Sequence, residues 1–261
     1  MRSRRSWLAR AQTRVSPRRA PAPAPAGARL ALPDGPVSAR LGPASTDTAP
    51  CRVGYDVAKR TLDLSVSLPV ALASLPIQAL IALAVRRRLG TPVLFRQTRP
   101  GLGGRPFTMV KFRTMHPVDP ARGWTDDASR MDAFGAWLRS TSLDELPTLW
   151  SVVRGDLSLV GPRPLLMSYL ERYTPTQARR HEVKPGLTGL AQINGRNAIT
   201  WDDRLRLDVQ YVDTRSLRLD LAILLRTLGL VLSRHGVAAP GESTMSEFRG
   251  SAPDALAQEG A

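Results

Sequence analysis

One uncharged stretch of sequence, residues 64–85, constrains the fold of this chain more than any other feature. It holds 22 residues without a charged side chain, and Lys59-Arg60 and Arg86-Arg87-Arg88 flank it. A straight helix of this length would reach about 33 Å, enough to cross a hydrocarbon core of about 30 Å. The stretch also contains Pro69 and Pro76, and a proline inside a helix removes a hydrogen bond and bends the chain.

The flanking charges favour one kind of bend. A plain membrane span carries its excess of cations on one side, whereas here both ends are cationic. A helix that enters the membrane, breaks near Ser74 and Pro76 and returns would keep both ends in the same leaflet. We therefore predict a re-entrant membrane helix over residues 55–90, with a kinked single span and a buried core helix as the alternatives.

The two ends of the chain differ in composition from its centre. Residues 1–54 are rich in Arg, Ala and Pro and show no apolar periodicity, so we expect a disordered basic arm. A transit peptide and a start codon assigned too early are the alternatives for this arm. Residues 238–261 are small, polar and mildly acidic, and we expect a disordered tail.

Charge and cysteine content limit the kinds of partner and site. The formal net charge of +15 implies acidic partners, which include nucleic acid, anionic lipid and phosphorylated substrates. The single cysteine, Cys51, excludes an internal disulfide framework and a cysteine-based zinc cluster. Three widely spaced histidines disfavour a histidine-rich metal site.

A β-hairpin is expected after the apolar stretch, with strands at residues 93–97 and 107–113. The glycine-rich segment Pro100-Gly101-Leu102-Gly103-Gly104 between them is a turn signal, and its glycines match neither phosphate-loop nor dinucleotide spacing. Lys111 and Arg113 alternate onto one face of the second strand. That face is either an anion platform or a solvated side.

A helix start is expected at Ser142, which forms a capping-box pattern with Glu145. Apolar residues follow at helical spacing up to residue 153. Asp144 and Glu145 are either ordinary first-turn acids or adjacent carboxylates that hold a divalent cation and supply a nucleophile. Arg139 precedes this pair closely enough to meet a phosphate bound by such a cation.

Two later stretches combine turns with polar side chains. Arg163 stands between two prolines, which stiffen its loop and favour phosphate binding; a tolerated surface arginine is the alternative. Residues 184–197 suit a polar ligand such as a nucleotide or sugar, or form a structural network of turns. Their candidate binding side chains are Gln192, Asn194 and Arg196.

Residues 217–232 predict the last helix. They carry many leucines with arginines around them. Such a helix lies in a membrane interface with its apolar face down, or packs in a core. The residues leave both options open.

Seven short runs carry a resemblance to a known family when they are taken in order. They resemble the bacterial sugar transferase family, the monotopic polyprenyl-phosphate phosphoglycosyl transferases of the small catalytic-domain type. Each run alone is weak, but the ordered set is specific. The runs are Lys59-Arg60-Thr61-Leu62-Asp63, Phe95-Arg96-Gln97, Lys111-Phe112-Arg113-Thr114-Met115, Thr141-Ser142-Leu143-Asp144-Glu145-Leu146-Pro147, Val160-Gly161-Pro162-Arg163-Pro164, Lys184-Pro185-Gly186-Leu187-Thr188-Gly189 and Ala191-Gln192-Ile193-Asn194-Gly195-Arg196.

This resemblance implies a fold and a location. The fold would be α/β and mostly helical, with a short β-hairpin, interfacial helices and a re-entrant helix broken at Ser74 and Pro76. The protein would be monotopic, with a catalytic domain over residues 91–237 at the cytoplasmic face of the bacterial inner membrane. Two departures are Leu75, where the family often has Ser before Pro, and Leu190, where many members have Trp.

The resemblance also implies an activity. A phosphosugar would move from a UDP-sugar to undecaprenyl phosphate with Mg²⁺ present and UMP released, which starts exopolysaccharide, O-antigen or glycoconjugate synthesis. Asp144 would attack phosphorus and form a covalent intermediate, and Asp144 and Glu145 would hold the cation. The expected substrate-binding residues are Lys111, Arg113, Arg139, Arg163, Gln192, Asn194 and Arg196.

The expected partners follow from this activity. They are the UDP-sugar, undecaprenyl phosphate, anionic membrane lipid, downstream glycosyltransferases and a second copy of the chain, with no specific nucleic acid. One rival is a catalytically inactive membrane adaptor of glycan assembly. The other is a basic nucleic-acid binder, which an aromatic share of 5% and the lack of a binding motif disfavour. The residues do not indicate which UDP-sugar is used.

Overall fold

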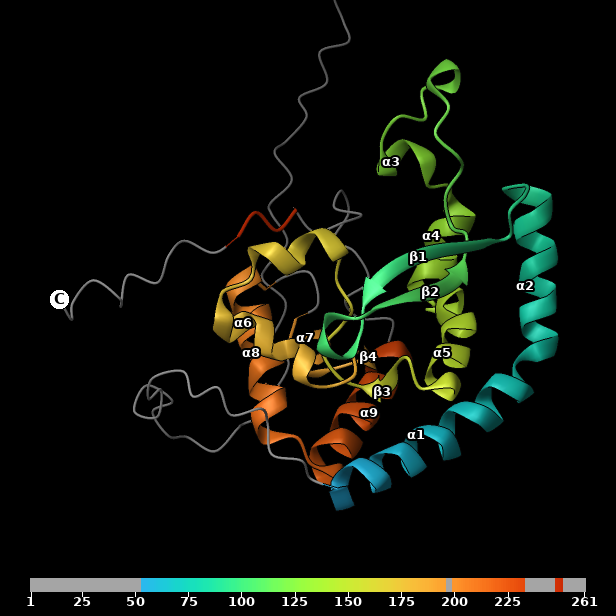
Figure 1. Ribbon diagram of the computed structural model, residues 1–261. Coiled ribbons are helices and arrows are strands. Elements are labelled where there is room, and N and C mark those ends of the chain that lie inside the picture. The colour runs from blue at the N-terminus through green and yellow to red at the C-terminus, as the bar shows by residue number, and fades with distance from the viewer. Residues whose placement is uncertain (1–52, 196–198, 233–246, 251–261) are drawn as a thin grey trace, which may run out of the picture. The chain divides into compact units, whose positions relative to one another are not determined.

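The computed structural model describes residues 53–195, 199–232 and 247–250. These residues form a mostly helical structure with two small pairs of strands (Figure 1). The predicted mostly helical fold with a short hairpin is confirmed. The predicted arm lies outside the described residues except for its last two positions, which belong to the first helix.

Two consecutive helices account for the uncharged stretch. Helix α1 (Val53–Ala73) and helix α2 (Leu75–Arg88) meet at Ser74 with a bend of 57°. Pro76 lies in the first turn of α2, where a missing N–H leaves no helical hydrogen bond unmade. The helix is therefore interrupted where the sequence predicts a break, and the position of this break in a membrane stays a prediction. Of the described helices, none is by itself long and apolar enough to cross a membrane, whereas this bent pair taken together meets that length and composition.

Polar contacts dock α1 onto the rest of the structure. Asp63 is buried and accepts hydrogen bonds from the Ser158 hydroxyl at 3.1 Å and the Leu159 amide at 3.0 Å. Arg60 donates to two carbonyls near the end of helix α5 (Leu149–Arg154), both at 2.7 Å. The charged residues ahead of the apolar stretch are therefore structural contacts as well as flanking charges.

The predicted hairpin is present as strands β1 (Leu94–Pro100) and β2 (Pro106–Phe112), which pair in antiparallel register. The turn between them is a short 3₁₀ helix, η2 (Leu102–Gly104). Gly103 and Gly104 have φ of 62° and 74°, a left-handed conformation that glycine adopts without steric cost. The predicted turn at this glycine-rich segment is therefore confirmed.

A second pair of strands was not predicted. Strand β3 (Ser158–Val160) and strand β4 (Gly186–Thr188) run parallel, with Ser158 opposite Gly186. A Cβ atom on Gly186 would lie 2.1 Å from the Gly161 nitrogen, so only glycine permits this approach. The glycines of two motifs thus bring two distant loops together.

The remaining helices all follow the hairpin in the sequence. Helix α9 occupies the residues at which the sequence predicts the last helix. The bounds are η3 (Pro120–Arg122), α3 (Asp127–Arg130), α4 (Ala133–Ser140), η4 (Leu143–Thr148), η5 (Met167–Arg172), α6 (Pro175–Ala178), η6 (Arg179–Glu182), α7 (Leu190–Ile193), α8 (Trp201–Thr214) and α9 (Leu217–Leu232).

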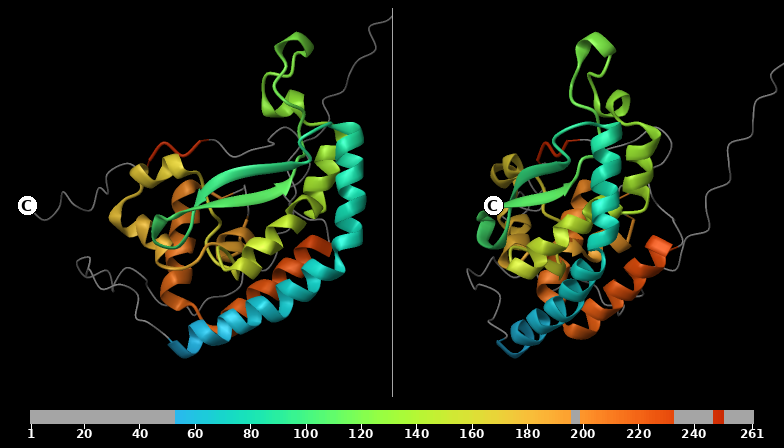
Figure 2. Two further views of the ribbon diagram at one scale, coloured as in Figure 1. Left: turned by 45° about the vertical axis from the view of Figure 1, so that its right-hand side comes forward. Right: turned by 90° about the vertical axis from the view of Figure 1, so that its right-hand side faces the viewer.

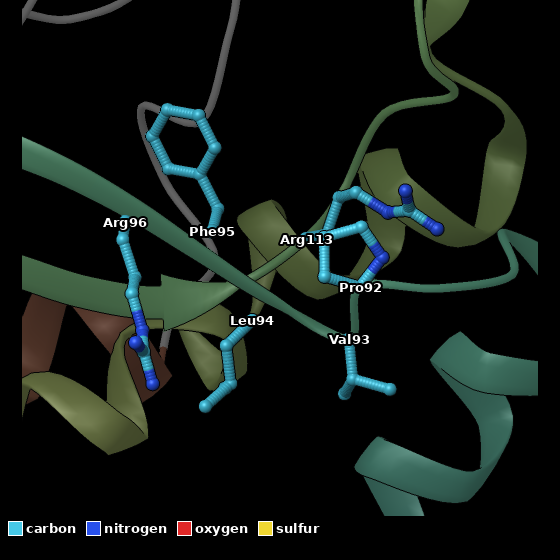
Figure 3. Close-up of a pocket in the computed structure, with 6 residues that line it drawn as sticks. All are labelled: Pro92, Val93, Leu94, Phe95, Arg96 and Arg113. Carbon is cyan, nitrogen blue, oxygen red and sulfur yellow. The ribbon is translucent and has the colours of Figure 1, made fainter.

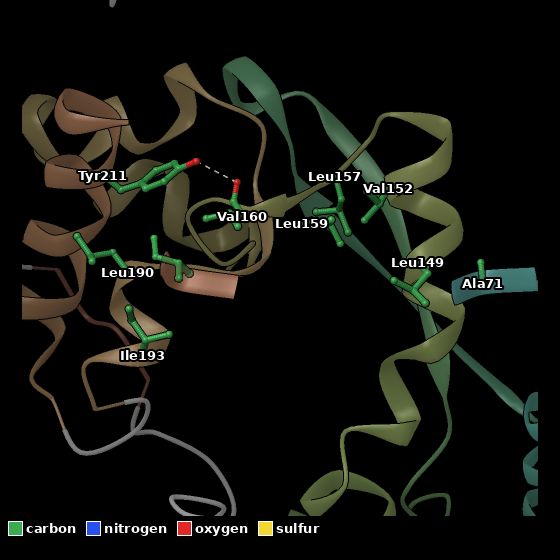
Figure 4. Packing of buried hydrophobic residues seen from close by; sticks show 10 residues of the cluster. Ala71, Leu149, Val152, Leu157, Leu159, Val160, Leu190, Ile193 and Tyr211 are labelled. Carbon is green, nitrogen blue, oxygen red and sulfur yellow. Dashed lines mark hydrogen bonds between the residues drawn. The ribbon is translucent and has the colours of Figure 1, made fainter. Parts of the chain in front are cut away.

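The main hydrophobic core is formed mainly by residues of α1, α5, β3, α7, α8 and α9. Its fully buried members include Val152, Leu157 and Ile223. Tyr211 on α8 is also buried, and its hydroxyl donates to the Val160 carbonyl at 3.2 Å (Figure 4). Helices α1 and α9 lie side by side along this core (Figures 1 and 2). The same packing therefore seats α1 and fixes the strand that leads to Arg163.

The predicted capping box at Ser142 is wrong. An N-cap residue normally has an extended backbone, whereas Ser142 has φ of 55° and its hydroxyl caps no helix N–H. The Glu145 side chain forms an ion pair with Arg163. The chain forms the 3₁₀ turn η4 first, and the α-helix begins only at Leu149.

The prediction of a disordered tail is wrong for residues 247–250. Phe248 is 1% exposed, because three aromatic rings surround it. A composition averaged over the whole tail hides a single aromatic anchor of this kind. The three rings belong to Tyr169, Tyr173 and Trp201, with centroids 5.3 to 5.7 Å from that of Phe248.

Candidate active site

The turn η4 places Asp144 and Glu145 against the hairpin. Ser142 turns the chain in the left-handed conformation just before the pair. Thr148, at the other end of the turn, donates its hydroxyl to the Val110 carbonyl of β2 at 2.8 Å. The two ends hold the Asp144 side chain inside, where the residue is 4% exposed.

The surroundings of Asp144 make its carboxylate unusual. Burial and the neighbouring Glu145 charge raise the pKa of Asp144 to about 6, and three cations oppose this rise. The three cations are Lys111, Arg139 and Arg163. The carboxylate is then mostly ionised at neutral pH yet poorly solvated, which is the condition of an activated nucleophile.

Lys111 reaches this group from β2. Burial lowers the pKa of Lys111, and the Asp144 carboxylate opposes that shift. The ammonium also lies 5.7 Å from the ring centroid of Phe95, its partner across the hairpin. Lys111 is therefore held on the inner face of the hairpin, toward the carboxylates.

Arg163 forms an ion pair with Glu145. Its Nη2 donates to Oε1 of Glu145 at 2.6 Å, and the carboxylate raises the pKa of Arg163. The loop of Arg163 is held as well, because Arg180 donates to the Arg163 carbonyl at 2.7 Å. Arg163 is thus a structured part of the carboxylate group and is not a tolerated surface residue.

Arg139 completes the positive side of the site. It lies at the end of α4, and its Nε donates to the Thr114 hydroxyl at 2.9 Å. Helix α4 approaches closely because residue 135 is glycine, where a Cβ atom would lie 1.9 Å from the Thr114 carbonyl oxygen. Three predicted binding residues, Lys111, Arg139 and Arg163, therefore gather around Asp144.

Arg113 is placed elsewhere. Its guanidinium donates to the carbonyls of Leu89 and Thr91, at the connection between α2 and β1. It also lines an open groove at the start of β1 with residues 92–96 (Figure 3). No carboxylate of the Asp144 group acts on its pKa, which burial alone lowers. The predicted platform shared by Lys111 and Arg113 is therefore not formed.

The residues predicted near position 192 have different environments. Both polar atoms of the Gln192 amide are buried and have no hydrogen-bond partner among the described residues. The Asn194 amide donates to the Leu190 carbonyl at 2.8 Å and so serves its own helix, α7. Arg196 lies outside the described residues.

Sequence reasoning missed the residues that support the Arg163 loop. Arg180 forms a buried ion pair with Asp208 at 2.7 Å, and Arg99 donates to the Pro164 carbonyl at 3.4 Å. A signal for Arg99 exists, because it shares a strand face with Gln97 of a quoted run. Arg180 and Asp208 are far apart in the chain and carry no such signal.

Asp144 and Glu145 can take part in binding a divalent cation. Across the described ranges, no group of three or more His, Cys, Asp or Glu side chains converges as a metal site. Mg²⁺ commonly uses only one or two carboxylates, with waters and substrate phosphates as its other ligands. The pair therefore fits such an ion when a phosphorylated substrate is present.

The family model described as bacterial sugar transferase matches residues 54–234. The chain belongs to the bacterial sugar transferase family. The resemblance drawn from the seven ordered runs is confirmed.

Curated sugar transferases of several bacteria are similar to this one. The uncharacterised sugar transferase EpsL of Bacillus subtilis is 49% identical over 196 residues, which cover 75% of this chain and 97% of that protein. A UDP-glucose:undecaprenyl-phosphate glucose-1-phosphate transferase of Caulobacter vibrioides is 42% identical, over 70% of this chain and 72% of that protein. An undecaprenyl-phosphate galactose phosphotransferase of Salmonella typhimurium is 37% identical, over 68% of this chain but only 41% of that protein.

Proposed function

We propose that this sugar transferase moves a sugar 1-phosphate from a UDP-sugar to undecaprenyl phosphate, at the first step of lipid-linked glycan assembly. The observation that carries the proposal is the buried Asp144 carboxylate, which faces three cations and has its pKa raised to about 6. An inactive adaptor has no use for such a carboxylate. The names of the Caulobacter and Salmonella relatives support the same reaction class.

The proposed reaction has two displacements at one phosphorus atom. An oxygen of Asp144 attacks the phosphorus that bears the sugar, the bond from this phosphorus to the bridging oxygen breaks, and UMP leaves with that oxygen. A phosphate oxygen of undecaprenyl phosphate then attacks the same phosphorus. The bond to Asp144 breaks, and the free carboxylate returns.

The surrounding charges would reduce the repulsion between a carboxylate and a pyrophosphate. Lys111, Arg139 and Arg163 bring positive charge to the place where negative charge gathers during transfer. Asp144 and Glu145 would hold Mg²⁺, which supplies further positive charge against the phosphates when bound. Arg163, paired with Glu145, orients that carboxylate.

We also propose that the protein sits on the cytoplasmic leaflet of the inner membrane through the α1–α2 pair and α9. Large apolar side chains on these helices are exposed, although they would be expected to avoid water. The bend between α1 and α2 would let the pair enter and leave one leaflet. The exposed side chains include Val70, Leu72, Ile77, Leu80 and Leu83 on the pair, and Leu217, Leu221, Leu225 and Leu228 on α9.

The test follows release of UMP by the full chain in nanodiscs. The protein is mixed with undecaprenyl phosphate, Mg²⁺ and each of a panel of UDP-sugars. Asp144→Asn and added chelator should abolish release. Asp156→Asn is the matched control, because Asp156 is partly exposed and pairs only with Arg154 at 3.1 Å among the contacts described for it.

Omitting the lipid tests the covalent step. Wild-type protein should then release at most one UMP per active site and retain label from the sugar but not from the uridine. Multiple turnovers without lipid, or label retained by Asp144→Asn, would contradict attack by Asp144. Silence of folded protein across a broad panel would contradict the transferase itself.

A further inference from the structure

Arg99 is a cation whose acceptors, in the part of the chain that the structure describes, are all neutral. It extends from β1 toward the Arg163 loop, and its Nη2 donates to Oε1 of Gln97 at 2.6 Å. Its Nη1 donates to the Pro164 carbonyl at 3.4 Å. Its Nε is buried and has no hydrogen-bond partner there. A guanidinium in this state has unused capacity for an acidic ligand.

A second cation stands close to Arg99. Burial and the charge of Arg163 lower the pKa of Arg99 to about 10, so the two guanidinium groups repel each other. Arg163 gives one nitrogen to Glu145 but keeps 37% of its side chain exposed. Arg180, behind the same loop, is matched by Asp208. Of these three arginines, Arg99 and Arg163 face one described carboxylate partner, Glu145, between them, so an excess of positive charge remains on this pair.

We propose that Arg99 and Arg163 together form a phosphate subsite beside the Asp144–Glu145 pair. A phosphate monoester would accept hydrogen bonds from both guanidinium groups and neutralise the charge that they share. Two phosphates of the proposed reaction have this chemistry: that of the departing UMP and that of undecaprenyl phosphate. The inference rests on the proposed function and adds a binding residue, Arg99, that lies outside both the seven runs and the carboxylate pair.

Arg99 has a second role that the test must separate from binding. Because it donates to the Pro164 carbonyl, it also helps to hold the Arg163 loop. A loop that has merely shifted would weaken every ligand at the site. Loss of a phosphate contact would weaken phosphorylated ligands only.

The experiment measures binding to the full chain in nanodiscs by calorimetry. The ligands are UMP, uridine and a short-chain polyprenyl phosphate, and the variants are Arg99→Met, Arg99→Lys and Arg96→Met. Arg96 is the matched control. It lies three positions before Arg99 in β1, and side chains an odd number of positions apart in a strand point to opposite faces. Arg96 lines the groove at the start of β1 (Figure 3). Thermal unfolding checks each variant, and Arg99→Lys carries the test if Arg99→Met does not fold.

We expect Arg99→Met to weaken a phosphorylated ligand by about tenfold and Arg99→Lys by less, because lysine keeps the charge but not the forked geometry. Uridine binding and the Arg96→Met protein should stay within about twofold of wild type. If only the affinity for UMP falls, the subsite binds the nucleotide phosphate. If only the affinity for the polyprenyl phosphate falls, the subsite binds the lipid phosphate.

Two results would overturn the subsite. One is equal weakening of UMP and uridine, which would limit Arg99 to holding the loop. The other is unchanged binding of both phosphates by folded Arg99→Met. If the wild-type protein is active and either result is found, the subsite is wrong and the proposed function stands. If the wild-type protein turns over no UDP-sugar, the proposed function itself is contradicted.

Discussion

At the scale of single residues, the raised pKa of Asp144 should appear in the pH dependence of transfer. Attack requires the ionised carboxylate, so the rate of UMP release should fall about tenfold per pH unit below pH 6 and level off above it. Glu145→Gln removes a charge that raises this pKa, and the acidic limb should move to lower pH. Lys111→Met removes a charge that lowers it, and the limb should move to higher pH. Single-turnover UMP release between pH 4.5 and 8 measures both shifts.

This prediction concerns the pH at which the rate of UMP release begins to fall, and not the maximal rate. Both variants lose activity for other reasons, since each removes a group from the site. Limbs that stay at the wild-type pH in both variants would mean that Asp144 does not set the profile. Arg122→Met, which changes an exposed cation over Trp124, serves as the unshifted control.

The sequence singles out the proposed reacting residues but does not indicate their conformation. Adjacent acids within an ordered set of motifs single out Asp144 and Glu145. Lys111 and Arg163 belong to other motifs of that set, whereas Arg139 is indicated only by its place just before the pair. The spacing of Ser142 and Glu145 imitates a capping box, because the pattern contains no information about the sign of φ. The ion pair with Arg163 depends on a contact across 18 residues, which local patterns do not encode.

At the scale of elements, the close approach of β3 and β4 depends on glycine. Gly186→Ala would place a Cβ atom 2.1 Å from the Gly161 nitrogen and 2.4 Å from the Thr188 oxygen, both backbone atoms that cannot swing away. We expect a loss of at least about 3 kcal/mol in the free energy of unfolding, together with loss of transfer. The free energy of unfolding is measured by urea titration, with circular dichroism as the signal.

A glycine in open space is the control for this change. Gly229 lies within α9 with nothing within 4 Å of a Cβ atom. Gly229→Ala should leave the protein as stable or stabilise it by about 0.5–1 kcal/mol, since alanine favours helix. Equal stability of the two variants would contradict the tight approach at Gly186.

Local signals predict the elements whose cause is local. Proline places the break between α1 and α2, and the glycine-rich turn places the hairpin. The parallel pair β3–β4 escapes prediction, because three-residue strands are too short for a period of two to appear and their pairing is non-local. The aromatic pocket that holds Phe248 is likewise assembled from residues far apart in the chain.

At the scale of the whole molecule, attachment to lipid should depend on the exposed leucines of α9. Leu221 and Leu225 are 51% and 62% exposed. The double change Leu221→Asp and Leu225→Asp would place two charges at the proposed interface, and binding to phosphatidylglycerol–phosphatidylethanolamine vesicles should fall at least severalfold. Flotation with the vesicles measures the bound fraction.

The control changes an exposed leucine away from the proposed membrane surface. Leu102, at the tip of the hairpin, is 47% exposed, and Leu102→Asp should leave vesicle binding near wild type. A similar loss in both proteins would point to a general effect of negative charge on a basic chain. No loss in either would exclude α9 from the membrane contact.

The contacts of Asp63 limit how far this enzyme can be divided into modules. Anchoring helices are often removed to obtain a protein that dissolves without detergent. Here, removal of α1 would leave the Ser158 hydroxyl, the Leu159 amide and two carbonyls of α5 without these partners. Helix α5 follows the turn that carries Asp144, and β3 leads to the Arg163 loop. A shortened chain would therefore lose part of its core along with the proposed anchor. Chimaeras between relatives should exchange α1 together with β3, so that both sides of this contact come from one parent.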